Sequence, residues 1–241
     1  SPRVVSQRSV AKDHFEMIVA AHEALDAAKP GQFINVAVTE APGMDPLLRR
    51  PFSLYRRLPN GDYSFVYRVV GRGTKLLSRL QPGDTLNVVG PLGRGFSLIA
   101  GSTRPALVGG GVGVPPLFFW AQRGLAEPGT ARALLGFATS DYAFGHDDFA
   151  TLGVSTEVAT DDGTLGHRGF VTELLAAAID RREVDAVYAC GPKPMLAAVA
   201  SLAREAGIPA QLAFEEAMGC GVGACLSCVI PIHTPEGVEY R

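Results

Sequence analysis

The hydrophobic pattern of the chain changes near residue 100, and this change limits the folds that the sequence can adopt. Before it, short β-type runs at 17–20, 33–38 and 63–70 are separated by turn signals such as Pro59-Asn60-Gly61-Asp62. After it, continuous apolar strands alternate with helical patterns, which is typical of a doubly wound parallel sheet. We therefore expect an antiparallel β-barrel over residues 1–100 and an α/β domain over residues 101–214.

The second half allows individual elements to be predicted. Strands are expected at 106–108, 131–137, 155–159, 186–189 and 211–214, and helices at 114–123, 171–180 and 193–206. The first half contains one convincing helix, at 74–80. Beyond residue 214, glycines and cysteines interrupt the periodicity, so residues 215–241 are expected to form a third, loop-rich region.

Composition excludes several classes of protein. Hydrophobic residues make up 47% of the 241 residues and charged residues 19%, which favours a packed core over a disordered chain. The net charge of -2 predicts neither a nucleic acid nor a membrane as a partner. No run approaches the roughly 20 apolar residues that cross a bilayer, and no apolar signal core follows the N-terminus. We expect a cytoplasmic protein.

Three of the four cysteines lie within nine positions. Cys220, Cys225 and Cys228 form a C-x₄-C-x₂-C pattern, whereas Cys190 stands alone. This is the plant-type [2Fe–2S] spacing, in which glycines let the loop fold around the cluster. A zinc site with His233 as fourth ligand is the alternative, although structural zinc more often uses paired C-x₂-C knuckles. The loop is therefore predicted to hold an iron–sulfur cluster.

Two glycine turns in the α/β half predict a dinucleotide site. Gly109 to Pro115 follows a strand and opens a helix, so its backbone can approach a pyrophosphate at the helix N-terminus. Because it departs from G-x-G-x-x-G, a purely structural turn explains it equally well. Residues 188–195 form a second such junction, where Cys190 lines the nicotinamide end or is a buried structural thiol. Candidate nucleotide residues are Gly110, Gly111, Gly113, Cys190, Gly191 and Pro192.

A third turn, Asp161-Asp162-Gly163, follows the strand at 155–159 and lies at the same edge of the predicted sheet. Asp162 is a further candidate for the nucleotide, but an ordinary Asp-Gly turn explains it as well. After the second strand, Ser140-Asp141 places an acidic residue where binding of the NADPH 2′-phosphate would need a cation. This favours NADH over NADPH.

Two elements of the barrel half suit a flavin nucleotide. Arg50-Pro51-Phe52-Ser53 places a cation, an aromatic ring and a hydroxyl at the start of a strand, with Arg50 and Phe52 on one face and Ser53 on the other. A guanidinium suits a diphosphate. Gly71-Arg72-Gly73-Thr74 opens the short helix and offers N–H groups to phosphate. A surface arginine beside a core phenylalanine is the alternative explanation of the first element.

Together these residues resemble the ferredoxin–NADP reductase superfamily, and within it the electron-transfer subunits of the two-subunit, NAD-dependent dihydroorotate dehydrogenases. The resemblance runs through nearly the whole chain. It is carried by the segments 30–33, 48–53, 70–74, 90–93, 109–115, 190–192 and 215–225. The cysteine loop that follows the nucleotide domain is its most selective part.

The resemblance implies that FAD lies between the two domains and NAD(H) on the second domain. It also implies a [2Fe–2S] cluster through which electrons leave the chain. It assigns to FAD the residues Arg50, Pro51, Phe52, Ser53, Tyr67, Arg68, Val69, Gly71, Gly73 and Thr74. The implied partner is an FMN-containing catalytic subunit, in a heterotetramer, that oxidises dihydroorotate in pyrimidine biosynthesis. Family members carry a fourth cluster cysteine a dozen or more residues after the third, and none follows Cys228 here, so we expect the sequence to stop short of it.

Two alternatives remain open at this stage. The chain could be a related reductase subunit that serves a ferredoxin or a hydrogenase. It could also be a zinc-stabilised module on a reductase scaffold that has lost its flavin.

Overall fold

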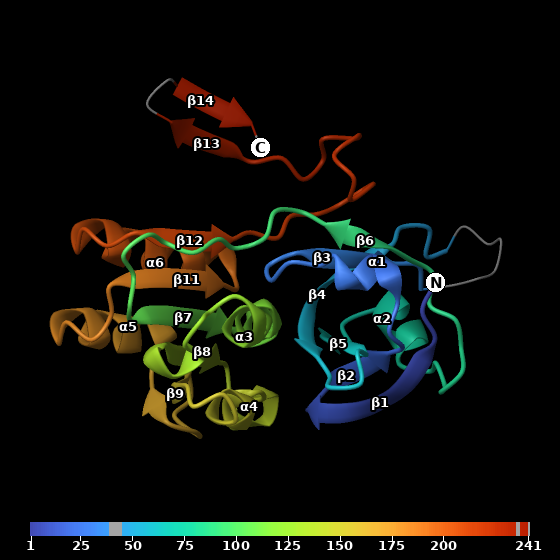
Figure 1. Ribbon diagram of the computed structural model, residues 1–241, viewed down its shortest axis with the longest axis horizontal. Helices are drawn as coiled ribbons and strands as arrows, with labels where there is room; N and C mark the ends of the chain where they lie inside the picture. The colour runs from blue at the N-terminus through green and yellow to red at the C-terminus, as the bar shows by residue number, and fades with distance from the viewer. Residues whose placement is uncertain (39–44, 235–236, 241) are drawn as a thin grey trace.

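The computed structural model describes residues 1–38, 45–234 and 237–240, apart from the side chain of His233 (Figure 1). It contains two six-stranded sheets side by side and a small hairpin near the C-terminus. The first sheet belongs to the N-terminal half and the second to the half that follows residue 100. The change in sequence pattern therefore coincides with a change from antiparallel to parallel pairing.

The N-terminal sheet has the order β1-β2-β5-β4-β3-β6, and all its neighbours are antiparallel. The start of β1 bonds back to residues 83–86, which brings the first strand against the segment that leads into the last. This closure gives the predicted barrel. Its elements are β1 Val4–Ala11, β2 His14–Val19, α1 Glu23–Asp26, β3 Phe33–Val36, β4 Arg50–Arg57, β5 Tyr63–Arg68, α2 Arg72–Leu77 and β6 Val88–Leu92.

Helix α2 begins two residues earlier than the predicted helix at 74–80 and ends three residues sooner. The reason is a capping interaction. The Thr74 hydroxyl accepts hydrogen bonds from the amides of Val70 and Gly71, at 3.0 and 3.3 Å, so the first turn starts at Arg72.

The second sheet is parallel and has the order β10-β9-β8-β7-β11-β12. Helices α3 and α4 pack on one face with Leu107 and Leu135, and α5 and α6 pack on the other with Val108 and Leu134. The predicted doubly wound domain is confirmed. Its elements are β7 Pro105–Gly110, α3 Val114–Arg123, β8 Arg132–Phe137, α4 His146–Ala150, β9 Ser155–Thr160, β10 His167–Arg168, α5 Val171–Asp180, β11 Ala186–Cys190, α6 Lys193–Glu205 and β12 Ala210–Ala213.

The two halves share a hydrophobic core. Tyr55 and Val66 of the barrel belong to one buried cluster with Phe118 and Trp120 of α3. The Tyr55 and Phe118 rings lie 5.0 Å apart between centroids. Because this contact is apolar and buried, it holds the two sheets as one body instead of leaving them joined only by a linker.

The region after β12 is only partly a loop. Residues 214–230 carry no regular element, as predicted, but β13 Pro231–Thr234 and β14 Gly237–Tyr240 pair as an antiparallel hairpin. The periodicity argument missed this hairpin because each strand has only four residues. In the described part of the chain, no helix is long and apolar enough to cross a membrane.

Candidate functional site

The two glycine turns lie together at the point where the strand order of the parallel sheet reverses. β7 and β11 are neighbours there, and in sheets of this kind ligands bind beyond the carboxyl ends of such a pair. The turns are in direct contact, since a methyl carbon on Gly113 would sit 2.1 Å from the carbonyl oxygen of Cys190. Only a residue without a side chain allows this approach. The predicted meeting of the two turns is confirmed.

The second turn is equally close-packed against the first. A methyl carbon on Gly191 would lie 3.0 Å from the amide nitrogen of Gly110. Burial, together with the smaller effect of the nearby Glu215 charge, raises the pKa of the Cys190 thiol to about 12. The thiol is therefore neutral at physiological pH and not a nucleophile, and its place at the nicotinamide end stays a prediction.

The two acidic candidates have local partners. The Asp162 carboxylate accepts hydrogen bonds from the hydroxyl and amide of Thr164, at 2.6 and 3.0 Å, and these lower its pKa. It follows β9, which β8 separates from the glycine turn after β7. Asp141 pairs with Lys12 at 3.3 Å. Both contacts account for these residues without a ligand, and their roles toward the nucleotide remain predictions.

The flavin motif on β4 borders a gap between two strands. β4 pairs with β3 from Arg50 to Ser53, but its pairing with β5 begins only at Leu54 opposite Phe65. Within the described ladder, the β5-facing edge of residues 50–53 is thus left without a strand partner. Unpaired backbone groups of this kind need a ligand or water, so the gap suits the edge of a flavin ring.

Arg50 lies over the start of α2. Its Nε would be 3.1 Å from a methyl carbon on Gly73, and its Nη1 donates to the carbonyl of Leu48 at 2.5 Å. The first turn of α2 carries no acidic residue. A guanidinium and the positive end of a helix repel each other unless an anion lies between them. The arrangement therefore fits a diphosphate.

The remaining predicted flavin residues differ in what they can offer. Tyr67 is 1% exposed and its hydroxyl donates to Gln7 at 2.5 Å, so its side chain belongs to the barrel core. Arg68 is exposed and stacks on Tyr142 at 4.4 Å. The amide of Val69 donates to Asp13 at 2.7 Å. Tyr67 can therefore reach a cofactor only through its backbone, and the roles of Arg68 and Val69 stay predictions.

The cysteine loop has backbone geometry that suits a metal–sulfur centre. The amides of Val222 and Cys225 both point at the Cys220 sulfur, at 3.4 Å. Amide N–H groups placed against sulfur stabilise the charge of thiolate ligands and of cluster sulfides. Hydrogen bonds with Ser227, whose hydroxyl lies at 3.2 Å, and with Cys220 lower the pKa of Cys225 to about 6. The thiolate form that binds metal is thereby favoured.

The cysteine sulfur atoms of the loop are not gathered into one metal-binding group in the structure. Among the residues that the structure describes, no three His, Cys, Asp or Glu side chains are gathered closely enough to hold a metal ion. The chemistry and spacing of the donors fit an iron–sulfur cluster, and the three cysteines are each at least partly accessible to one. His233, the fourth ligand of the zinc alternative, has its side chain outside the described residues.

The loop rests against the barrel strand next to the flavin motif. The Asn35 amide of β3 donates to the Cys220 carbonyl at 3.4 Å, and a methyl carbon on Gly221 would lie 2.4 Å from the same amide nitrogen. Asn35 is itself paired with Pro51 on β4. Adjacent strands are about 4.8 Å apart. The cysteine loop is thus one strand away from the predicted flavin residues.

The segment between β12 and the loop links the second glycine turn to the cysteine loop (Figure 1). Ala213 pairs with Cys190 at the second glycine turn. Glu216 then forms an ion pair with Lys193 at 2.6 Å, at the start of α6. From there the chain crosses to β3. The segment therefore runs from the nucleotide turns to a cysteine loop that rests on β3, the strand next to the flavin motif.

Sequence reasoning missed Asn35. It is 1% exposed, and its Oδ1 has no hydrogen-bond partner in the structure. The signal was available, because a single amide interrupts the otherwise apolar run at 33–38. A separate hollow of about 310 Å³ lies between residues 94–97 and 211–213. None of the predicted cofactor residues lines it.

Comparison with known proteins adds a family to this geometry. Residues 215–241 match the iron–sulfur cluster binding domain of dihydroorotate dehydrogenase B. The electron transfer subunit of dihydroorotate dehydrogenase B (NAD(+)) from Bacillus caldolyticus is 45% identical over 96% of this chain and 88% of the relative. The same subunit from Bacillus mycoides is 41% identical over 99% of this chain and 91% of the relative.

Solved structures agree on the fold. The NADH-dependent reduced ferredoxin-NADP oxidoreductase, studied for flavin-based electron bifurcation, superposes with a TM-score of 0.84 at 30% identity over 99% of this chain and 84% of that one. A ferredoxin NADP+ reductase from Neisseria gonorrhoeae with bound FAD and NADP gives a TM-score of 0.71 at 15% identity, over 88% of this chain and 98% of that one. The second likeness concerns the fold alone.

Proposed function

Because this chain belongs to the family of electron transfer subunits of NAD(+)-dependent dihydroorotate dehydrogenase B, we propose that it carries electrons between NAD(H), FAD and an iron–sulfur cluster on behalf of a dihydroorotate dehydrogenase catalytic subunit. The observation that supports this most directly is the position of the cysteine loop on β3, one strand from the flavin motif. Electron transfer between a flavin and an iron–sulfur cluster needs the two to lie close together. A structural zinc site would not need to lie near the flavin.

Each motif has a distinct task in this function. Arg50 and the start of α2 bind the FAD diphosphate, and the open edge of residues 50–53 holds the flavin ring. The turns at Gly113 and Cys190 bind NAD(H) beside it. When bound there, FAD would supply the conversion between the two-electron hydride of NADH and the single electrons that an iron–sulfur cluster requires. The loop at Cys220, Cys225 and Cys228 holds the cluster.

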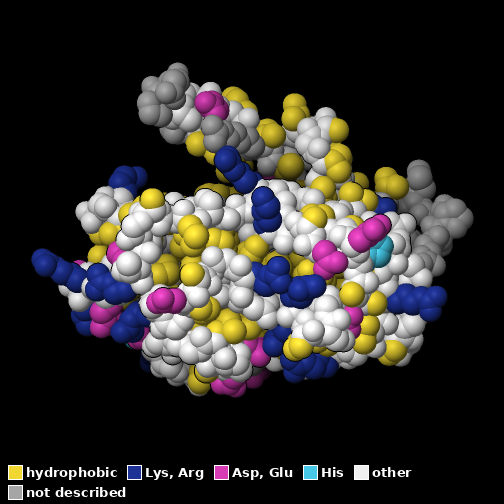
Figure 2. Space-filling model, viewed as in Figure 1, with side chains coloured by type: hydrophobic (Ala, Val, Ile, Leu, Met, Phe, Trp, Pro, Cys, Tyr) yellow, Lys and Arg dark blue, Asp and Glu magenta, His cyan; other side chains and the backbone are white. Residues whose placement is uncertain are grey.

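The cysteine loop also presents an apolar surface. Val222 and Leu226 expose 58% and 63% of their area, and apolar side chains gather on this segment in Figure 2. Exposed apolar side chains beside a redox centre mark a site of contact with a protein. We assign it to a catalytic subunit that contains FMN, in a heterotetramer. The cytoplasmic location expected from the sequence stays a prediction.

The test is a visible spectrum with iron and zinc analysis on protein of verified C-terminal length, followed by reconstitution. We expect flavin bands, iron, no zinc, and reduction of the flavin by NADH. Mixed with the FMN-containing subunit, the chain should support dihydroorotate-dependent reduction of NAD+. Zinc in place of iron would contradict the proposal. Rapid reduction of a free ferredoxin without the partner would support instead the related ferredoxin-linked reductase.

Gly71→Ala is expected to weaken FAD binding while leaving the protein fold intact. A methyl carbon at this position meets no protein atom within 4 Å, and the backbone is extended there with φ of −169°. A steric clash of about 1–3 kcal/mol, equivalent to roughly tenfold to a hundredfold in affinity, arises only if a cofactor phosphate approaches this backbone.

The measurement is FAD titration of the apoprotein by fluorescence, with thermal unfolding of the same samples. Gly129→Ala is the matched control, since its methyl carbon meets only ordinary contacts at 3.5 Å, far from the flavin motif. Equal FAD affinity in the Gly71→Ala variant and the control would remove Gly71 from the flavin site.

A further inference from the structure

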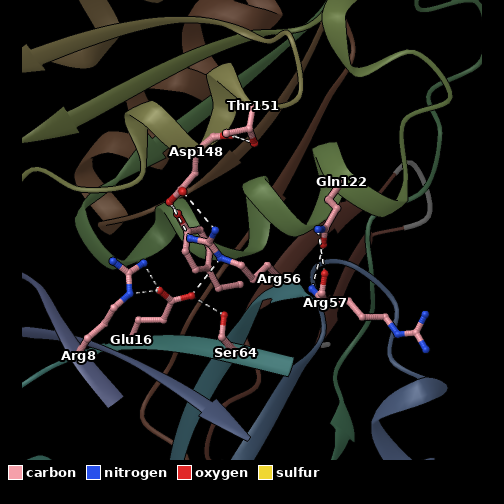
Figure 3. A network of polar contacts seen from close by, with 9 residues as sticks. Arg8, Glu16, Arg56, Arg57, Ser64, Gln122, Asp148 and Thr151 are labelled. Atoms are coloured by element: carbon pink, nitrogen blue, oxygen red, sulfur yellow. Dashed lines mark hydrogen bonds and ion pairs between the residues drawn. The ribbon is translucent and has the colours of Figure 1, made fainter. Parts of the chain in front are cut away.

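Arg56 of β4 is bound by two carboxylates, one in the barrel and one in the nucleotide domain (Figure 3). Its Nη1 and Nη2 bind Asp148 of α4 in a fork, at 3.1 and 2.7 Å. On its other side, Nε lies 3.0 Å from Glu16 Oε1 of β2, an ion-pair distance at which the N–H is not aligned for a hydrogen bond. One guanidinium is thus held between an acid of each domain.

Glu16 is the fixed end of this arrangement. Its side chain is 3% exposed, and besides Arg56 it accepts from Arg8 at 2.5 Å and from Ser64 at 2.8 Å. These partners come from β1, β4 and β5, so the carboxylate is tied to three barrel strands. A buried carboxylate of this kind is costly unless all its partners are present.

The same guanidinium is enclosed by one aromatic ring from each domain. Its central carbon lies 4.3 Å from the Tyr55 ring of the barrel and 5.2 Å from the Phe118 ring of α3. The Tyr55 hydroxyl donates to Asp148, and burial raises the pKa of Tyr55, so the donor stays protonated. Charge, fork geometry and stacking all act across the interface, a combination that arginine provides and lysine does not.

A second polar contact joins β4 to the nucleotide domain one residue further on, this time through α3. The Gln122 side chain of α3 accepts from the Arg57 amide at 2.9 Å and donates to the Arg57 carbonyl at 3.0 Å. It completes the backbone hydrogen bonds of β4 as a neighbouring strand would. Residues 55–57 of β4 are therefore fastened to both α3 and α4.

The fastened elements are those that carry the cofactor motifs. β4 begins with Arg50 to Ser53 at the flavin site, and α3 begins directly after the glycine turn that ends at Gly113. Fastening β4 to α3 and α4 at residues 55–57 thus fixes the distance between the two motifs. Hydride transfer is sensitive to such distances, since a displacement of about 1 Å can cost roughly a hundredfold in rate.

We propose that Arg56, held between Glu16 and Asp148, is a positioning residue that sets the orientation of the two domains for hydride transfer between NAD(H) and the flavin. The inference rests on the proposed function, because it presupposes a flavin on β4 and a nicotinamide at the glycine turns. Arg56 touches neither cofactor motif directly, and it acts through the two elements that it joins.

The test uses the full chain with its cofactors and the variants Asp148→Asn and Arg56→Lys. Rapid mixing with saturating NADH measures the limiting rate of flavin reduction, and titration measures the NADH dissociation constant. We expect the limiting rate to fall by roughly tenfold to a hundredfold, with FAD content and the NADH dissociation constant near the wild-type values. Hydrogen exchange at the Arg57 amide should become faster, because its acceptor on α3 moves.

The matched control is Arg132→Lys. Arg132 is also half-buried between two carboxylates, Glu157 at 3.0 Å and Glu183 at 3.3 Å, but all three lie in the nucleotide domain. An equal fall in rate in this control would show general destabilisation and overturn the proposal. Wild-type rates and exchange in the Asp148→Asn variant would also overturn it. If NADH failed to reduce the flavin of the wild-type protein, the proposed function itself would be wrong.

Discussion

Cys225→Ser is expected to abolish electron delivery to the catalytic subunit while NADH still reduces the flavin. Cys225 lies in the centre of the C-x₄-C-x₂-C pattern, and its amide supports the Cys220 sulfur at 3.4 Å. A serine hydroxyl does not replace a thiolate toward iron. Loss of an outer partner of a metal site costs about 10–100-fold, so loss of a ligand should cost more than about 100-fold.

Two measurements separate the cluster from the flavin. Iron content and the long-wavelength absorption of the purified variant should fall sharply, and dihydroorotate-dependent NAD+ reduction with the partner should fall with them. Flavin reduction by NADH should persist, since none of the residues assigned to FAD or NAD(H) belongs to the cysteine loop. Cys190→Ser is the control for iron, because that thiol belongs to the glycine turn. Full iron content in the Cys225→Ser variant would exclude this loop as the cluster site.

The sequence predicted those helices that are long enough to give a pattern and that have clear start and stop signals. α3 begins and ends at Val114 and Arg123 as predicted, because a glycine turn and prolines mark its start, and Arg123 followed by Gly124 marks its end. α5 also has the predicted bounds. α4, with five residues from His146 to Ala150, was missed because so short a helix has no period to detect. The four-residue strands of the C-terminal hairpin were missed in the same way.

The cofactor motifs were predictable because each is local in sequence, but their connections were not. Arg56 and Asp148 are 92 positions apart, and nothing near either residue indicates the other. Glu16 did carry a signal, as an acid between Phe15 and Met17 on a strand whose neighbours are apolar. Asn35 carried a similar one. A lone polar residue in a buried strand predicts that a partner exists without identifying it.

The cofactor motifs and the contacts that connect them have different roles in electron transfer. The glycine turns, the flavin strand and the cysteine loop are each held by backbone groups: the contact of Gly113 with Cys190, the ladder with β3, and the amides at the Cys220 sulfur. Their mutual distances depend instead on Asn35, the Lys193–Glu216 pair and the Arg56 network. Substitutions in the first group should remove a cofactor, whereas substitutions in the second should slow transfer between cofactors that remain bound.

Gly113→Ala belongs to the first group and is expected to remove NADH-dependent reduction of the flavin. The new methyl carbon would lie 2.1 Å from the Cys190 carbonyl oxygen and 2.7 Å from the Gly191 nitrogen. Both neighbours are backbone atoms, so the two turns must separate. Such overpacking costs about 1–3 kcal/mol in stability, and a shift of about 1 Å in the bound nicotinamide costs roughly a hundredfold in rate.

The effect should appear in the NADH dissociation constant and in the limiting rate of flavin reduction, both measured by rapid mixing. Reduction of the same flavin by dithionite should be unchanged, because this reductant does not use the nucleotide site. Gly129→Ala again serves as control, since it adds the same methyl group to the same domain with ordinary contacts only. Normal NADH kinetics in the Gly113→Ala variant would mean that the nucleotide binds away from the junction of β7 and β11.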